Sequence, residues 1–208
     1  MPVELGGSAV NNLADNILLF GMAPGTANIF AATYTTFGDI VKKQYPDLVP
    51  SYYPVEQILD TSYIAAVAAR NPQMAPAAMP SFSKADRVDT IVSRRAWNIN
   101  FETGSANFTP GAKVELEQMV RDLLVAGNTL VEVHGHTDNV GAPDSNMNLS
   151  EQRAFAVKQF LESQSSVSFP EGRVRIFAHG QQNPVVPNAS PEWRAKNRRV
   201  EIVLGTSK

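Results

Sequence analysis

Apolar positions in the first 70 residues recur with the spacing of α-helices. Residues 10–20 place apolar side chains three or four positions apart, on one face of a helix. Two further helices are predicted over residues 26–45 and from Pro54 to about residue 67, with proline at the favoured first helical position. We therefore predict that residues 1–70 form a helical region.

The apolar pattern stops between residues 71 and 85. Three prolines separated by Ala, Ser and Met, with no apolar period, are typical of an extended linker. We place a domain boundary in this linker and predict a second domain over residues 86–208. Within it, residues 86–93 are compatible with a short strand or a helical lead-in.

Strand-like and helix-like patterns alternate through the second domain, which predicts an α/β fold with helices on one face of a sheet. Alternating or continuous apolar residues mark the strands, and apolar residues at helical spacing mark the helices. The predicted strands cover residues 96–101, 130–134, 173–179 and 199–204, and the predicted helices cover residues 109–126 and 149–163.

The loop between the second predicted strand and its following helix carries the candidate chemistry. Ser150 is suited to cap that helix, which would place Arg153 in the first turn, at the positive end of the helix dipole. A cation in this position indicates an anionic ligand. Asp138 would hold an ammonium group and Arg153 a carboxylate, so the pair fits the zwitterionic end of an amino acid. Alternatively, the two side chains pair with each other and only fix the loop.

The same residues form a recognisable motif. GHTD at residues 135–138 is followed by N-x-x-L-S-x-x-R-A-x-x-V-x-x-x-L at residues 146–161. This pattern resembles the signature of the OmpA-like peptidoglycan-binding domain family, and the resemblance extends to residues 99–110 and 179–202. It implies an OmpA-like βαβαββ sandwich, with a mixed four-stranded sheet and helices on one face, over residues 86–208.

The resemblance also implies a function. Members of this family bind peptidoglycan without catalysis through the diaminopimelate residue of the stem peptide, and thereby anchor envelope proteins to the cell wall. It implies a periplasmic location, at the wall or outer membrane of a Gram-negative bacterium, with no catalytic residue, cofactor or metal. By motif position, Asp138 would bind the ligand ammonium and Arg153 its carboxylate. The other residues implied at the site are Thr137, Asn146, Leu149, Glu102 and Arg198 or Arg199.

The helical region resembles a different family. Residues 11–25 and 37–64 are similar to the C-terminal part of periplasmic solute-binding proteins, some of which are joined to an OmpA-like domain. The resemblance implies that residues 1–70 are a remnant of such a domain, without most of its binding lobes. We also expect the chain to be part of a longer protein.

Two other functions remain compatible with the sequence. His134, His136 and Asp138 could ligate zinc or iron in a metal-dependent hydrolase. Alternatively, residues 1–70 could dock another envelope protein or a second copy of the chain, as an interaction scaffold.

The composition of the chain excludes several other classes of function. The 208 residues carry a net charge of −2, which gives no basic field for nucleic acid. The absence of cysteine excludes disulfides and thiolate chemistry. The longest apolar runs are shorter than the roughly 18 residues of a membrane helix, so we predict no membrane-spanning segment.

Overall fold

The computed structural model describes residues 3–5, 8–10, 12–72, 81–83, 85–102 and 104–207. The chain divides into two compact units, one of Met1–Pro80 with Arg121–Val125 and the other of Ser81–Val120 with Ala126–Lys208. The division at residue 80 falls inside the predicted linker, of which residues 73–80 and 84 lie outside the described part. The extents of the two domains stay a prediction.

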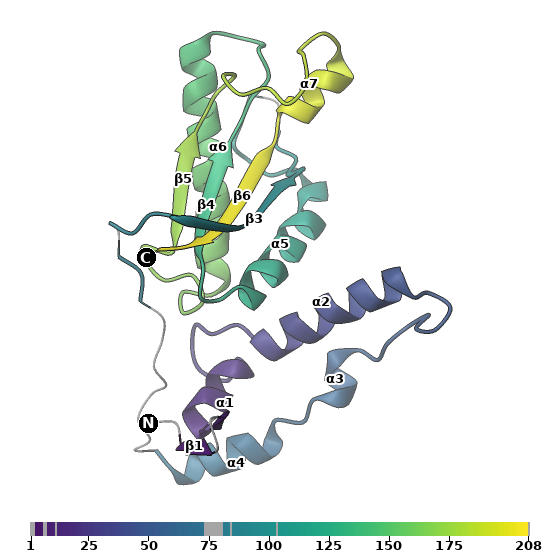
Figure 1. Ribbon diagram of the computed structural model, residues 1–208, viewed down its shortest axis with the longest axis vertical. Helices are drawn as coiled ribbons and strands as arrows, with labels where there is room; N and C mark the ends of the chain where they lie inside the picture. The colour runs from purple at the N-terminus through teal and green to yellow at the C-terminus, as the bar shows by residue number, and fades with distance from the viewer. Residues whose placement is uncertain are drawn as a thin grey trace. The chain divides into compact units, whose positions relative to one another are not determined.

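The N-terminal unit combines a small hairpin with helices (Figure 1). The aromatic side chains of Phe20, Phe30, Tyr34 and Tyr52 follow one another at centroid distances of 5.3, 6.3 and 5.6 Å and pack this unit together. Its elements are the antiparallel strands β1 (Val3–Leu5) and β2 (Ser8–Val10), followed by helices α1 (Leu13–Leu19), α2 (Ile29–Gln44), α3 (Val55–Ile58) and α4 (Ser62–Arg70).

The structure corrects two of the helix predictions in this unit. The helix predicted from residue 10 begins only after Asn12, whose side chain forms a capping box with Asp15. The helix predicted from Pro54 to residue 67 is interrupted, because Leu59 is extended and the Asp60 carboxylate accepts a hydrogen bond from the Ser62 N–H. The hairpin before α1 was not predicted.

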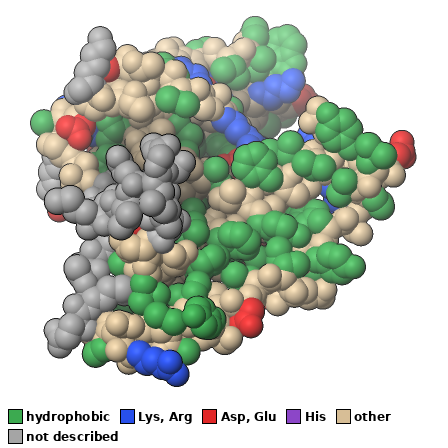
Figure 2. Space-filling view, turned by 60° about the horizontal axis from the view of Figure 1, so that its bottom comes forward, with side chains coloured by type: hydrophobic (Ala, Val, Ile, Leu, Met, Phe, Trp, Pro, Cys, Tyr) green, Lys and Arg blue, Asp and Glu red, His purple; other side chains and the backbone are tan. Residues whose placement is uncertain are grey.

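Helices and loops of the N-terminal unit leave large apolar side chains exposed. Leu48 and Tyr63 are 81% and 78% exposed, and Figure 2 shows apolar side chains gathered on the face that it presents. The other large apolar side chains that this unit exposes are Phe37, Ile40, Val41, Tyr45, Tyr53 and Ile58. Isolated apolar residues at a surface are ordinary, but a group of neighbouring ones is typical of a contact surface.

A mixed four-stranded sheet forms the centre of the C-terminal unit, in the order β3-β6-β4-β5 (Figure 1). β4 and β5 are parallel, whereas β6 runs antiparallel to both β4 and β3. This confirms the predicted fold class. The strands are β3 (Thr90–Trp97), β4 (Leu130–Gly135), β5 (Val174–Ala178) and β6 (Val200–Thr206).

Helix α6 (Pro143–Gln164) lies against β4 and β5 (Figure 1). Its buried residues recur every three or four positions, which is the spacing of one helix face turned to the sheet. A short 3₁₀ helix, η1 (Pro110–Ala112), leads into α5 (Lys113–Val125), and α7 (Pro191–Asn197) precedes β6. In the described part of the chain, the helices are too short or too polar to cross a bilayer.

Two boundaries and one helix in this unit differ from the predictions. The first strand covers Thr90–Trp97 instead of residues 96–101, so the segment left open as strand or lead-in contributes half of it. Helix α6 begins at Pro143, six residues before the predicted start. Helix α7 was not predicted.

Candidate functional site

The site lies at the end of the sheet where β4 stops and β6 begins. Gly135 at the end of β4 pairs with Val200 at the start of β6. The loop after β4 is then fixed by its backbone, since the His136 N–H donates to the Arg199 carbonyl and the Thr137 N–H to the Gly180 carbonyl, at 3.1 and 2.8 Å. The next residue, Asp138, is therefore held in a defined position.

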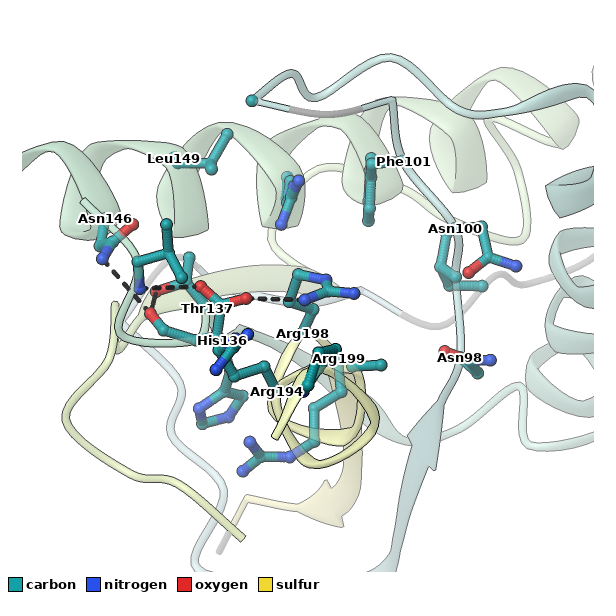
Figure 3. Close-up of a pocket in the computed structure, with 17 residues that line it drawn as sticks. Asn98, Asn100, Phe101, His136, Thr137, Asn146, Leu149, Arg194, Arg198 and Arg199 are labelled. Atoms are coloured by element: carbon teal, nitrogen blue, oxygen red, sulfur yellow. Dashed lines mark hydrogen bonds and ion pairs between the residues drawn. The ribbon is translucent and has the colours of Figure 1, made fainter. Parts of the chain in front are cut away.

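A cleft of about 620 Å³ opens beside this loop. In Figure 3, Asn146 and Thr137 lie toward one end of the cleft and Asn98 and Asn100 toward the other, with Arg198 between them. The lining combines polar and apolar side chains, and its charged groups are more often cationic than anionic. Its polar side chains belong to Asn98, Asn100, His136, Thr137, Asp138, Asn146, Arg153, Arg194, Arg198 and Arg199.

Asp138 is buried, with 8% of its surface exposed. One carboxylate oxygen, Oδ1, accepts a hydrogen bond from the Val140 N–H at 3.0 Å. The other, Oδ2, lies 2.7 Å from Nη1 of Arg198 and forms an ion pair with it (Figure 3). The carboxylate at the cleft wall is thus already compensated by a cation from the same chain.

Arg153 is a buried cation in the same cleft, only 6% exposed. Its Nε donates to the Ser105 carbonyl at 3.0 Å, and its guanidinium carbon lies 4.9 Å from the centre of the Phe101 ring. Burial lowers the pKa of Arg153, nearby Arg198 lowers it further, and Asp138 opposes this effect. Within the described residues, Arg153 forms no ion pair, and Asp138 acts on its charge only at longer range.

The structure does not support the alternative that Asp138 and Arg153 pair with each other, because the ion pair of Asp138 is with Arg198. The prediction that Ser150 caps the helix was wrong. Ala142 occupies the N-cap, and Ser150 lies within α6, where its hydroxyl donates to the Met147 carbonyl. Arg153 is therefore not in the first turn. It reaches the cleft because it lies on the buried face of α6.

Three other predicted residues also line the cleft. Thr137 donates its hydroxyl hydrogen bond to the Asp138 carbonyl at 2.9 Å. The Asn146 amide donates to the same carbonyl and to Oε1 of Gln181, at 3.3 and 2.8 Å. Leu149 supplies an apolar part of the wall. Thr137 and Asn146 thus hold the loop around Asp138 as well as facing the cleft.

Of the remaining predicted residues, Arg198 and Arg199 lie at the cleft and Glu102 lies outside it. Glu102 is exposed, its carboxylate accepts from the Asn107 amide at 3.3 Å, and it does not line the cleft. Arg198 and Arg199 both line it. Arg199 is engaged elsewhere, with its Nη2 2.6 Å from Oε1 of Glu201, so Arg198 is the one that faces Asp138.

Sequence reasoning missed one whole wall of the cleft. Arg194 lies in α7 and lines the cleft, as do Asn98 and Asn100 after β3. The start of α7 was readable, because Ser190 caps it, Pro191 occupies its first turn and Glu192 follows. The asparagines carry no comparable signal, since their position depends on where β3 ends.

The three histidines form a stack beside this cleft. The His179 ring lies between those of His134 and His136, at centroid distances of 5.1 and 4.7 Å, and Nδ1 of His134 is 2.8 Å from Nε2 of His179. Among the residues that the structure describes, no group of three His, Asp or Glu side chains is arranged to hold a metal. The ligand set His134, His136 and Asp138 of the hydrolase alternative is therefore not assembled.

Comparison with known families agrees with this architecture. The model of the OmpA family matches residues 100–198, which include the loop with Asp138, helix α6 and α7. The C-terminal half of the chain is an OmpA family domain. The predicted resemblance is thereby confirmed at the level of the family for residues 100–198.

Curated relatives of the OmpA family domain come from several bacteria. The chain is 36% identical to the probable lipoprotein YiaD of Escherichia coli, over 56% of this chain and 52% of YiaD. It is 30% identical to the peptidoglycan-binding protein ArfA of Mycobacterium tuberculosis, over 83% of this chain and 51% of ArfA. For the peptidoglycan-associated lipoprotein of Pseudomonas aeruginosa the identity is 32%, over 55% and 66%. The chain thus spans about half to two thirds of these relatives.

Proposed function

We propose that this chain binds peptidoglycan non-covalently, and that its cleft holds the diaminopimelate residue of a stem peptide. Asp138 would receive the free ammonium group of that residue and Arg153 its carboxylate. Thr137, Asn146 and Leu149 would shape the pocket around them. Such binding requires no bond to be made or broken, so we propose an anchoring role and not an enzymatic one.

One observation carries this proposal. A buried cation, Arg153, and a buried anion, Asp138, face the same cleft without pairing with each other. Burying a charge without a partner is costly, so a carboxylate that enters the cleft and bonds to Arg153 recovers part of this cost. A ligand end that carries both an ammonium and a carboxylate matches this arrangement.

The names of two relatives support the same ligand class. ArfA of Mycobacterium tuberculosis is called peptidoglycan-binding, and the lipoprotein of Pseudomonas aeruginosa peptidoglycan-associated. We propose that the chain lies in the cell envelope, in the periplasm and close to the wall or outer membrane. The origin of residues 1–70 from a solute-binding domain, and their use as an interaction scaffold, stay predictions.

Co-sedimentation of the full chain with purified diaminopimelate-type sacculi tests the proposal. Wild-type protein is expected in the pellet, whereas Asp138→Asn and Arg153→Gln are expected to remain largely in the supernatant. A hydrogen bond to a charged group contributes about 1.5–3 kcal/mol, which corresponds to roughly a ten- to hundred-fold loss of affinity.

Glu102→Gln provides the matched control, because it also removes one carboxylate but from a residue outside the cleft. This variant should sediment like the wild type, and all variants should retain the wild-type circular dichroism spectrum. Equal sedimentation of wild type, Asp138→Asn and Arg153→Gln would contradict the proposed role of the cleft.

A further inference from the structure

The guanidinium of Arg198 forms an ion pair with the Asp138 carboxylate, to which the ammonium group of the proposed ligand would bind. Its Nη1 lies 2.7 Å from Oδ2 of Asp138, and the other oxygen of that carboxylate is taken by the Val140 N–H. Both oxygens of Asp138 therefore have a partner before any ligand arrives. An incoming ammonium group meets a carboxylate that is already compensated, and it has to compete with the guanidinium.

Arg198 is placed so that it can be displaced. The Arg198 side chain is 45% exposed, whereas that of Asp138 is 11% exposed, so the guanidinium reaches from the rim to a carboxylate at the inner wall. Its side chain makes the contact with Asp138 and no other side-chain hydrogen bond in the described residues. Arg199 differs, because it is held by Glu201 and by the Asn183 carbonyl.

The free-energy cost of displacing Arg198 from Asp138 depends on the ligand that replaces it. A plain amine exchanges one cation for another at Asp138 and leaves both Arg198 and Arg153 without an anion. A ligand end with an ammonium and a carboxylate replaces Arg198 at Asp138 and at the same time brings an anion to Arg153 and to the released Arg198. The repulsion between Arg198 and Arg153, which contributes to the lowered pKa of Arg153, is compensated only in this second case.

We propose that Arg198 is a specificity-determining residue of the cleft: it acts as an internal competitor that excludes amines without a carboxylate. This inference rests on the proposed function and adds to it the residue that selects between ligands with and without a carboxylate. The cleft would accept the zwitterionic end of diaminopimelate and reject the lysine side chain that replaces it in other stem peptides.

The test is calorimetric titration of the full chain with two probes, meso-diaminopimelate and Nα-acetyl-L-lysine methylamide, which carries the ammonium without a carboxylate. In Arg198→Gln the vacated Asp138 is expected to bind the lysine probe about ten-fold more tightly than the wild type does, as for one charge-assisted contact. The preference for diaminopimelate over the lysine probe should fall accordingly.

Two further variants separate competition from unfolding and from net charge. Arg198→Lys keeps a cation opposite Asp138 and should keep the wild-type preference. Lys196→Gln removes one positive charge from helix α7, which ends just before Arg198, but outside the cleft, and should also keep this preference. A loss of fold in Arg198→Gln would appear as a lowered melting temperature that Arg198→Lys does not share.

The outcomes distinguish this inference from the proposed function. If Arg198→Gln binds the lysine probe no more tightly than the wild type, Arg198 is not a competitor, even when the wild type binds sacculi. If the wild type binds neither sacculi nor diaminopimelate, the proposed function fails, and tighter binding of the lysine probe by Arg198→Gln would still support competition at Asp138.

Discussion

The hydroxyl of Ser150 lies 2.9 Å from the backbone nitrogen of Gly180 and accepts its hydrogen bond. This contact joins the middle of α6 to the loop after β5. The same loop supports the site, because the Gly180 carbonyl accepts from the Thr137 N–H, one residue before Asp138. Ser150 therefore acts on the cleft through the loop that it holds.

Replacing Ser150 by alanine should destabilise the domain. The variant leaves the buried N–H of Gly180 without its acceptor, which costs about 1–3 kcal/mol in the free energy of unfolding. Urea denaturation measures the change. Ser163→Ala is the control in the same helix, because its hydroxyl is exposed and bonds only to near neighbours, donating to the Phe160 carbonyl and accepting from the Gln164 amide. Equal stability of Ser150→Ala and Ser163→Ala would show that the Gly180 contact contributes nothing.

Gly135 is required where β4 crosses α6. A methyl group on this residue would lie 2.1 Å from the Ser150 carbonyl oxygen, which belongs to the helix backbone and cannot move without shifting α6. Gly135→Ala should therefore lower the free energy of unfolding by about 3 kcal/mol or more. Gly111→Ala, with nothing within 4 Å of its added methyl group, should stay close to the wild type in the same denaturation experiment. Retention of wild-type stability by Gly135→Ala would contradict the close packing of β4 and α6.

The His136 imidazole should make stability depend on pH. Its ring is buried, 4% exposed, and both ring nitrogens lack a hydrogen-bond partner in the described residues. Burial lowers the pKa of His136 to about 4, Arg199, His179 and His134 lower it as well, and Glu201 opposes them. Because the unfolded chain takes up this proton near pH 6.5, stability is lost as the pH falls from about 6.5 to 4, and this residue causes no further loss below 4.

The size of this effect is on the order of 3 kcal/mol across that interval, from 1.36 kcal/mol per pKa unit. His136→Phe keeps an aromatic ring in the stack but removes the titrating group. Unfolding free energies measured between pH 7 and 4 should fall less steeply for this variant than for the wild type. Identical pH profiles would show that His136 is not buried in its neutral form.

Much of the cleft was predictable because its residues follow strand ends and helix faces. Asp138 lies three residues after the end of β4, and α6 carries Asn146, Leu149 and Arg153. Their convergence follows from the order of a strand and a helix packed on it. The resemblance to the OmpA family placed the same residues in one site.

The local reasoning about Arg153 was nevertheless wrong. It assumed that Ser150 began the helix, although Pro143 followed by Asp144 is an equally good first turn. Although α6 begins earlier than predicted, Arg153 still lies at the cleft, because it shares the buried helix face with Ser150 and Val157. Arg153 lines the cleft for a reason different from the one given, and its role as a carboxylate receptor stays a prediction.

The ion pair between Asp138 and Arg198 could not be read from the chain. The two residues are 60 positions apart, and their contact depends on the antiparallel pairing of β6 with β4. The wall formed by Arg194 depends in the same way on a short helix before β6. Such contacts arise from strand order, which local patterns do not determine.

Titration of the full chain with meso-diaminopimelate tests the central claim most directly. The wild type and Glu102→Gln should show saturable binding, whereas Asp138→Asn and Arg153→Gln should each bind at least about ten-fold more weakly. Binding by both of these variants with wild-type affinity, or no saturable binding by the wild type, would contradict the assignment of the two charges to the two ends of one ligand.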